Sequence, residues 1–340
     1  MFLIKKARET IRKYNLLSKD DKVLIGVSGG PDSVALTLIL NLLKRELSLR
    51  LYIAHLDHRL RKNSNKDREF VRALAKKLNL PFISKKINVN RLPRKGSLEE
   101  IAREARLKFL FKVAKRVEAN KIALGHNQDD QAETVLMRLI RGTGLAGLSS
   151  ILPKRKIGNW VIIRPLIEIP RKAIDSYLKR RRVKPCLDLS NKNTVYFRNR
   201  IRNRLLPILG KDYNPKIKEI LANLAQIAAY DYDYLEKASV KAFHRLKRPL
   251  SKRRGKSSTG IRLRLDRLSR LHPSIQRLAL RFAIAQIKGS RRQLSFRHIK
   301  EIDDLVFFRP IGSIVDLPQG LAVCKDKGCL YIYKKNNKNP

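Results

Sequence analysis

The most chemically suggestive stretch of the sequence is the hexapeptide Ser-Gly-Gly-Pro-Asp-Ser at residues 28–33. A β-branched run precedes it at 22–27 and an apolar helical pattern follows at 34–43, which predicts a strand-to-helix turn. The glycines let backbone N–H groups approach an oxyanion, the proline suits a first helical turn, and the helix N-terminus adds positive potential. These residue types predict a phosphate site, although a plain Gly-Gly-Pro turn capped by Ser28 or Asp32 explains six residues equally well.

An acid, Asp32, stands in this turn where the common phosphate loop has a lysine. A carboxylate beside phosphate calls for a cation. Mg²⁺ is usually held by one or two carboxylates together with substrate phosphates. The turn therefore favours a phosphorylated ligand with Mg²⁺ at Asp32.

A second acidic cluster lies in the stretch ALGHNQDDQAETVLMRLIRGTG, residues 123–144. Asp129, Asp130 and Glu133 open a helix directly after a strand end, and the spacing from Asp129 to Glu133 predicts two carboxylates on one helix face. Taken alone, the cluster is better explained as a cap that complements the helix dipole. Beside an acidic phosphate turn, carboxylates on two neighbouring strand ends can share Mg²⁺ around a triphosphate, or one can act as a base.

The first half of the chain alternates strand patterns with helix patterns. Apolar strand-like runs occur at 22–27, 49–56, 81–89 and 121–126, and helical patterns occur at 33–47, 66–79 and 97–118. This alternation predicts an α/β fold with a doubly wound parallel sheet covered on both faces. Ligands of such sheets bind beyond the carboxyl ends of the strands, which is where Ser28, His55, Asp57 and His126 fall.

The strand and helix alternation ends after residues 141–151. An extended entry, a proline and a basic helix follow at 164–183, with further helical patterns at 216–246 and 273–287 and a hairpin-like end. We expect a catalytic domain at 1–150, a linker and the start of a second domain at 151–215, a mainly helical domain at 216–333 and a polar tail at 334–340. The basic stretch 247–260 is expected to be a solvated loop.

The chain is strongly basic, with 77 Lys and Arg residues against 29 Asp and Glu residues, a net charge of +48. Residues 1–145 carry a net +17 and residues 146–340 a net +31. Such a charge favours a nucleic-acid partner, contacted more by the second half, although compositional drift explains part of the excess. Three scattered cysteines indicate a reducing compartment, and no apolar run has the length of a membrane span. We expect no membrane partner, and interpret the basic residues 1–21 as a helix of the domain rather than a leader.

Five motifs occur in the order and rough spacing of one enzyme family: SGGPDS (28–33), HLDHRLR (55–61), GHNQDDQAET (125–134), RGTGLAGL (141–148) and RNRIRNRLLP (198–207). The sequence thereby resembles tRNA(Ile)-lysidine synthetase, of the N-type ATP pyrophosphatase (PP-loop) superfamily, over essentially its whole length. The first motif marks only the superfamily, and the later ones are more specific. The resemblance implies an adenine nucleotide alpha hydrolase-like fold, and the early end after LPQGLAV (317–323) matches the short form of the family.

The resemblance also implies a reaction and two substrates besides ATP. ATP adenylates C2 of the wobble cytidine in the CAU anticodon of tRNA(Ile), pyrophosphate leaves, and the ε-amine of L-lysine then displaces AMP to give lysidine. The residues implied to hold ATP are those of the first motif: Ser28, Gly29, Gly30, Pro31, Asp32 and Ser33. Mg²⁺ is assigned to Asp32 and Asp129.

The reaction centre is implied to lie at Asp32, His126, Asp129 and Glu133. Arg103 and Arg106 match a basic pair of the family that would stabilise charge on the activated cytidine, and the alternative is ordinary surface helix charge. His55, Asp57 and His58 look like a metal triad, but packing or contact with the nucleotide is the expected role.

The last motif alternates arginines with small polar or apolar residues. Arg198, Arg200, Arg202 and Arg204 could form a solvated helix face, but in so basic a half of the chain we expect contact with tRNA phosphates.

Two other functions compete with the ligase. A tRNA thiolase of the same superfamily would need a catalytic cysteine or a Cys-x-x-Cys pair, and the sequence has no such pair. A nucleotide- and RNA-binding module without catalysis would explain the charge but not Asp32, Asp129 and Glu133. A homodimer stays open, and the expected location is the plastid stroma if the protein is plastid-encoded, or otherwise the bacterial cytoplasm.

Overall fold

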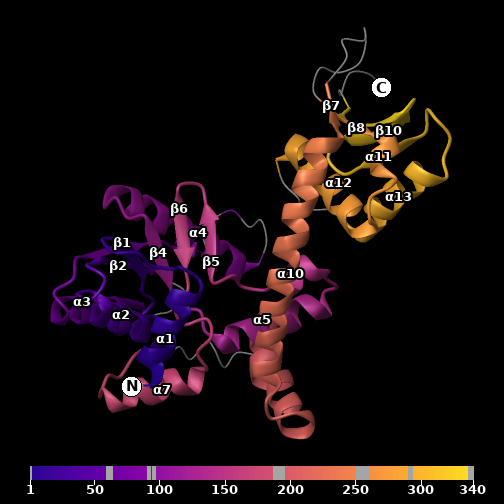
Figure 1. The fold of residues 1–340 in the computed structure, drawn as a ribbon. Helices are drawn as coiled ribbons and strands as arrows, with labels where there is room; N and C mark the ends of the chain where they lie inside the picture. Colours follow the sequence, from indigo (N-terminus) through magenta and orange to yellow (C-terminus); the bar gives the residue numbers. More distant parts are fainter. Residues whose placement is uncertain are drawn as a thin grey trace. The chain divides into compact units, whose positions relative to one another are not determined.

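A six-stranded sheet with strand order β3-β2-β1-β4-β6-β5 organises the first part of the chain in this computed structural model (Figure 1). The structure describes residues 2–58, 64–89, 93, 97–186, 196–249, 260–289 and 294–335. Neighbouring strands are parallel except β5, which pairs antiparallel with β6. The strands are β1 (Lys22–Gly26), β2 (Arg50–Asp57), β3 (Phe82–Lys86), β4 (Lys121–Leu124), β5 (Lys154–Ile157) and β6 (Trp160–Ile163).

Helices cover both faces of this sheet, because successive side chains of a buried strand point to opposite sides. Val23 and Ile25 of β1 belong to one core with α1, α2, α3 and α7, and Leu24 between them belongs to a second core with α4. The helices are α1 (Phe2–Lys13), α2 (Pro31–Leu43), α3 (Ser64–Lys77), α4 (Leu98–Arg116), α5 (Gln128–Ile140), α6 (Leu145–Leu148) and α7 (Arg171–Arg180). The predicted doubly wound α/β fold is confirmed.

A third apolar core joins α5 to the segment that carries the arginine motif. Val135 and Leu136 of α5 pack with Ile201, Leu206 and Leu221. This segment runs through α8 (Phe197–Arg200), the π-helical turn η3 (Ile201–Leu205), α9 (Leu206–Ile208), a second π-helical turn η4 (Leu209–Tyr213) and the start of α10 (Ile217–Leu246). It therefore belongs to the same unit as the sheet.

The chain divides into two compact units, residues 1–229 and 230–340, so the division falls inside α10. The domain end that we expected at residue 150 lies within the first unit instead. The physical reason is that β6 adds to the sheet beside β4, with Ile162 opposite Ile122, and apolar packing then continues through the arginine segment. Of the expected polar tail at 334–340, residues 336–340 lie outside the described residues, as does most of the expected loop at 247–260.

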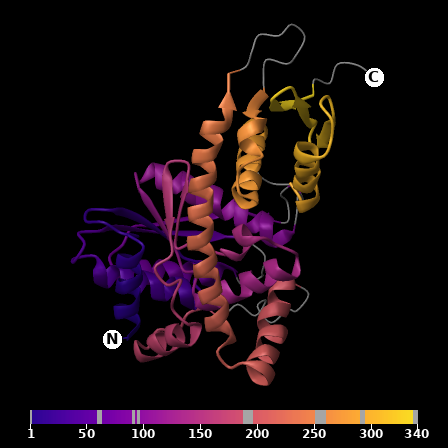
Figure 2. The same ribbon diagram turned by 45° about the vertical axis from the view of Figure 1, so that its right-hand side comes forward.

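The second unit combines helices with a five-stranded antiparallel sheet of order β7-β8-β11-β10-β9, so the description "mainly helical" is incomplete. Its core includes Phe243, Leu263, Leu280, Ile302 and Leu330, and α12 and α13 pack against the sheet (Figure 2). The expected terminal hairpin is β10 with β11. The elements are β7 (Lys247–Arg248), β8 (Gly260–Arg264), α11 (Leu265–Leu268), α12 (Pro273–Lys288), α13 (Phe296–Phe307), β9 (Ile314–Leu317), β10 (Leu321–Asp326) and β11 (Cys329–Lys334). Within the described ranges no helix is long and apolar enough to cross a membrane.

Candidate active site at the carboxyl ends of the strands

The Ser28–Ser33 turn connects β1 to α2 and is held by its own hydroxyl groups. Gly30 is the N-cap of α2 and Pro31 is its first residue. The N–H of Ser28 donates to Ser33 Oγ at 3.1 Å, and Ser33 Oγ donates to the Gly30 carbonyl at 2.9 Å. Gly29 has a φ of +93°, a conformation that favours glycine. The turn is thus preorganised at a helix N-terminus, as an anion site requires.

The end of β4 lies directly against this turn. A Cβ on Gly125 would lie 2.9 Å from the backbone carbonyl carbon of Asp32, so only glycine allows this approach. The contact brings buried Asn127 to Asp32, and Asn127 Nδ2 donates to Asp32 Oδ1 at 2.8 Å. Asn127 also caps α5 in a capping box with Asp130. One amide side chain therefore links the phosphate turn to the second acidic motif.

Asp32 is a partly buried carboxylate with less positive charge around it than its burial requires. Arg171 Nη1 donates to Asp32 Oδ2 at 2.8 Å, and the Asn127 amide donates to the other oxygen. Even so, burial, together with the charge of Asp130, raises the pKa of Asp32 to about 6 from 3.8, against the lowering effect of Arg171 and Asn127. Asp32 is thus electrostatically suited to gain a further cation.

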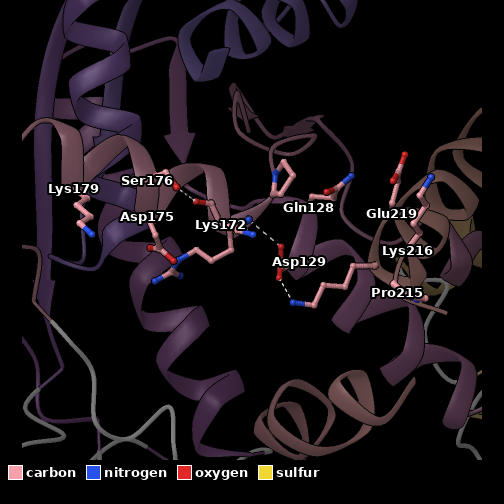
Figure 3. Close-up of a pocket in the computed structure, with 12 residues that line it drawn as sticks. Gln128, Asp129, Lys172, Asp175, Ser176, Lys179, Pro215, Lys216 and Glu219 are labelled. Atoms are coloured by element: carbon pink, nitrogen blue, oxygen red, sulfur yellow. Dashed lines mark hydrogen bonds and ion pairs between the residues drawn. The ribbon is translucent and has the colours of Figure 1, made fainter. Parts of the chain in front are cut away.

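Asp129 faces a different set of partners from Asp32. Its Oδ1 accepts the backbone N–H of Arg171 at 3.0 Å, and its Oδ2 accepts from Lys218 Nζ at 2.5 Å. Figure 3 shows Asp129 between α7 and the segment after residue 214. These elements enclose a pocket of about 560 Å³ lined by Gln128, Asp129, Pro170, Arg171, Lys172, Asp175, Ser176, Lys179, Pro215, Lys216, Lys218 and Glu219. Asp129 therefore joins three segments and already has a cationic partner.

Glu133 and Asp130 share two arginines. Glu133 is 1% exposed, and it accepts from Arg198 Nε at 2.8 Å and from Arg202 through Nε at 2.5 Å and Nη2 at 2.9 Å. Asp130 Oδ1 accepts from Arg198 Nη2 at 2.8 Å. Asp129 and Glu133 have different partners: Asp129 contacts Arg171 and Lys218, whereas Glu133 contacts the same arginines as Asp130 of the capping box.

The four arginines of RNRIRNR are not equivalent. Arg198 and Arg202 are four residues apart, so they lie on one helical face, toward the acids of α5. Arg200 and Arg204 are exposed, and the Arg200 guanidinium lies 5.6 Å from the centre of the Phe197 ring. From the sequence we expected all four arginines to contact tRNA. In the structure, Arg198 and Arg202 instead pair with carboxylates of α5.

His126 lies in a strongly positive part of the site. Its Nδ1 accepts from Arg164 Nε at 3.2 Å. Burial first, and then the charges of Arg164, Arg106, Arg198 and Arg103, hold the pKa of His126 well below 6.5. Exposed Arg103 and half-buried Arg106 on α4 thus act on this imidazole, so the structure brings the expected basic pair near His126.

The histidines at the end of β2, His55 and His58, are packed against the protein. His55 is buried and donates from Nδ1 to the Val27 carbonyl at 2.9 Å. Burial, with the charge of Arg106 and His55, lowers the pKa of His58 to about 4. Within the described ranges no group of three or more His, Cys, Asp or Glu side chains could hold a metal. The last residues of the HLDHRLR motif, 59–61, lie outside the described residues.

Sequence reasoning missed three residues of this site: Asn127, Arg164 and Arg171. An Asn followed by an acid three positions later is a capping signal, and it could have identified Asn127. Arg164 interrupts the apolar run WVIIRPLI, and a charge within such a run is a sign of a special role. Nothing local distinguishes Arg171 from the other basic residues of α7.

Comparison with known proteins places these features in a family. A PP-loop domain model matches residues 3–209, and a TilS substrate binding domain model matches residues 263–331. The chain is 38% identical to a tRNA(Ile)-lysidine synthase of Caldanaerobacter subterraneus subsp. tengcongensis, over 99% of this chain and 70% of that protein. It belongs to the tRNA(Ile)-lysidine synthase family. Members from Clostridioides difficile and Geobacter sulfurreducens are 35% and 37% identical, over 96% and 95% of this chain and 70% and 67% of theirs.

These family members are bacterial, so the expected plastid location receives no support. A solved structure with a similar fold is the U34-tRNA thiolase NcsA from Methanococcus maripaludis with its [4Fe-4S] cluster. It has a TM-score of 0.55 and 21% identity, and covers 67% of this chain and 79% of its own. This likeness shows the shared fold alone, and the thiolase alternative gains nothing from it.

Proposed function

We propose that this member of the lysidine synthase family ligates L-lysine to C2 of the wobble cytidine of tRNA(Ile) with a CAU anticodon, through an adenylated tRNA intermediate. One observation carries the proposal. The phosphate turn of β1 and the acidic, arginine-bound start of α5 meet at one edge of one parallel sheet, joined by the Asn127 bond to Asp32. L-lysine, the CAU anticodon, a bacterial cytoplasmic setting and a homodimer are parts of this proposal.

The first half-reaction uses the phosphate turn. A pyrimidine carbonyl is a poor electrophile, so the cytidine O2 first attacks the α-phosphorus of ATP, and pyrophosphate leaves with the electron pair of the broken bond. Ser28, Gly29, Gly30, Pro31 and Ser33 would hold the polyphosphate through the turn and the helix N-terminus. Arg103 and Arg106 supply positive charge for the activated cytidine.

Mg²⁺ fits one of the two carboxylates expected to hold it. Asp32 has hard oxygen donors and a pKa raised by burial, and it stands beside the phosphate turn, where one carboxylate plus substrate phosphates is an ordinary Mg²⁺ site. Asp129 fits less well, because Lys218 and the N–H of Arg171 already occupy its oxygens. Mg²⁺ at Asp32 would neutralise charge on the phosphates.

The second half-reaction needs a deprotonated amine. The lysine ε-amine attacks C2 of the adenylated cytidine, AMP leaves, and a carboxylate takes the proton of the amine. Asp129, Asp130 and Glu133 are the carboxylates of α5 at the site, and an acidic cluster also attracts an ammonium group. Glu133 would first have to change its pairing with Arg198 or Arg202.

The tRNA would be held by basic surface of both units. Arg200 and Arg204 are exposed and suit phosphate contact, whereas Arg198 and Arg202 would have to exchange carboxylates for phosphates. The second unit contains the match to the TilS substrate binding domain, which supports a role in the same contact.

The test is nucleoside analysis of a CAU-anticodon tRNA(Ile) after incubation with the protein, ATP and lysine. We expect lysidine, with AMP and pyrophosphate released in equal amounts. A matched tRNA with guanosine at the wobble position serves as the control and should stay unmodified. Release of ADP and phosphate, or a sulfur-containing nucleoside in place of lysidine, would overturn the proposal.

A further inference from the structure

The inference concerns Arg164, which directly follows β6 and is 4% exposed. Its side chain donates to the Leu152 carbonyl through Nη1 at 2.5 Å and to His126 Nδ1 through Nε at 3.2 Å. In the described part of the chain no carboxylate pairs with it. A buried guanidinium without a counter-ion is unfavourable, and burial with the charges of Arg103 and Arg155 lowers the pKa of Arg164 to about 10. Such an arrangement calls for a functional explanation.

The bond from Arg164 fixes which ring nitrogen of His126 carries the proton. The Nε of an arginine is always a donor, so Nδ1 of His126 must accept, and the proton of the neutral ring is on Nε2. Nε2 has no partner among the described residues. His126 therefore presents an unused N–H donor in the site, and its orientation is set from behind by a buried side chain.

The surroundings of His126 oppose a second proton on the ring. Arg164 from the segment after β6, Arg103 and Arg106 from α4, and Arg198 from α8 all lower its pKa. A further proton would have to bind Nδ1, which the Arg164 N–H already occupies. Proton acceptance would thus break the bond from Arg164 to the ring.

We propose that Arg164 is a positioning residue that holds His126 as a fixed Nε2–H donor for an oxygen that gains negative charge during adenyl transfer, and that His126 takes no proton in the reaction. The inference rests on the proposed function. When the cytidine O2 bonds to the α-phosphorus and the bond to the pyrophosphate oxygen breaks, negative charge shifts among phosphate oxygens, and a preorganised donor stabilises it. The base for the lysine amine is then a carboxylate.

The direct test is ¹⁵N NMR of the histidine side chains of the full-length protein, with the His126 signals assigned through His126→Gln. We expect an unprotonated Nδ1 and a protonated Nε2, unchanged between about pH 5.5 and 8, the range in which an ordinary histidine titrates. A proton on Nδ1, or titration near the ordinary histidine pKa, would overturn the proposal. This test needs no turnover, so it is independent of whether the protein makes lysidine.

The second test compares three variants. Arg164→Met removes the donor, and Arg164→Lys keeps a donor and charge. Arg155→Met removes an exposed charge that acts on Arg164 without a bond to His126. We expect Arg164→Met to slow adenylation by about tenfold to a hundredfold with ATP binding little changed. The variant should also raise the pKa of His126 above its wild-type position, because one of the charges that lower it is gone, and should no longer fix the proton on Nε2. Arg164→Lys should restore part of the rate, and Arg155→Met should match the wild type.

An unchanged tautomer and rate in folded Arg164→Met would refute the positioning role. If that variant does not fold, the wild-type spectrum and Arg164→Lys decide alone. Failure of the wild type to modify tRNA would instead refute the proposed function, whatever the tautomer.

Discussion

Partly buried Asp32 and buried Glu133 are carboxylates at the same sheet edge, yet their surroundings differ. Glu133 accepts three bonds from the guanidinium groups of Arg198 and Arg202. Asp32 accepts one bond from Arg171 and one from a neutral amide, and burial raises its pKa to about 6. The charge of Glu133 is neutralised by two arginines of the protein, whereas the charge of Asp32 is compensated only in part.

This difference indicates which of the two carboxylates is suited to bind a cation. A carboxylate matched by arginines mainly stabilises the fold, because losing either partner leaves a buried charge. A carboxylate whose charge is poorly compensated destabilises the free protein, and the arrival of a cation relieves that cost. Functional sites commonly contain such groups.

The largest effect is expected for Glu133→Ala, which removes the carboxylate that pairs with both of the partly buried guanidinium groups of Arg198 and Arg202. We expect a loss of about 3–5 kcal/mol of unfolding free energy, measured by urea denaturation. Glu46→Ala, which breaks an exposed pair with Arg8, is the control and should cost less than about 1 kcal/mol. Equal losses in the two variants would show that the Glu133 cluster is no more than surface charge.

Gly125→Ala should damage the Asp32 side selectively. The new Cβ would lie 2.9 Å from the Asp32 carbonyl group and the Ser33 N–H, which are backbone atoms that cannot rotate away. We expect a loss of about 1–3 kcal/mol and weaker ATP binding, measured by thermal unfolding and calorimetry. Gly210→Ala adds a Cβ to open space in the helical turn η4, so it should not lower stability and should leave ATP binding unchanged. If Gly125→Ala bound ATP normally, the turn after β4 would not contribute to ATP binding.

Asp32→Asn should make the free protein more stable and the enzyme inactive. A raised pKa means that the folded state disfavours the ionised carboxylate, so its cost is full above about pH 6 and disappears as the pH falls to 3.8. We expect a gain of about 1–2 kcal/mol at pH 8, reduced because Arg171 loses a partner, and a smaller gain at pH 5. Adenylation should be lost while tRNA binding remains.

Unfolding curves at the two pH values check this sign. A variant that is less stable than the wild type at pH 8 would mean that Arg171 and Asn127 already compensate Asp32 fully.

The smallest effect is expected for Arg200→Gln with Arg204→Gln, which alters exposed arginines next to the Glu133 cluster but not its bonds. Stability should stay unchanged, and each lost phosphate contact should lower the salt dependence of tRNA binding by about one unit of log–log slope. Filter binding over a series of salt concentrations measures the slope. An unchanged slope would assign these two arginines to the solvated face that the sequence also allowed.

The sequence could predict which residues lie close together at this sheet edge, because the carboxyl ends of parallel strands lie at the same edge. The strand runs place Ser28, His126 and the acids of α5 after β1 and β4, which are neighbours in the sheet, and their meeting follows from topology. The pairings could not be predicted. Helical spacing predicts Asp129 and Glu133 on one face, yet it is Asp130 of the capping box that shares arginines with Glu133. A helix outside the expected catalytic domain supplies Arg171.

By itself, the sequence determined the doubly wound sheet, the strand-to-helix turn at 28–33, the family and the residue types that follow the strand ends, because these depend on local periodicity and on motifs. Tertiary structure alone decided which charges neutralise one another: Arg198 and Arg202 against Glu133, Lys218 against Asp129, and Arg164 behind His126. The physical reason is that ion pairing and burial depend on distances between segments far apart in the chain. A run of arginines looks uniform in sequence until folding pairs some of them with carboxylates and leaves the others exposed.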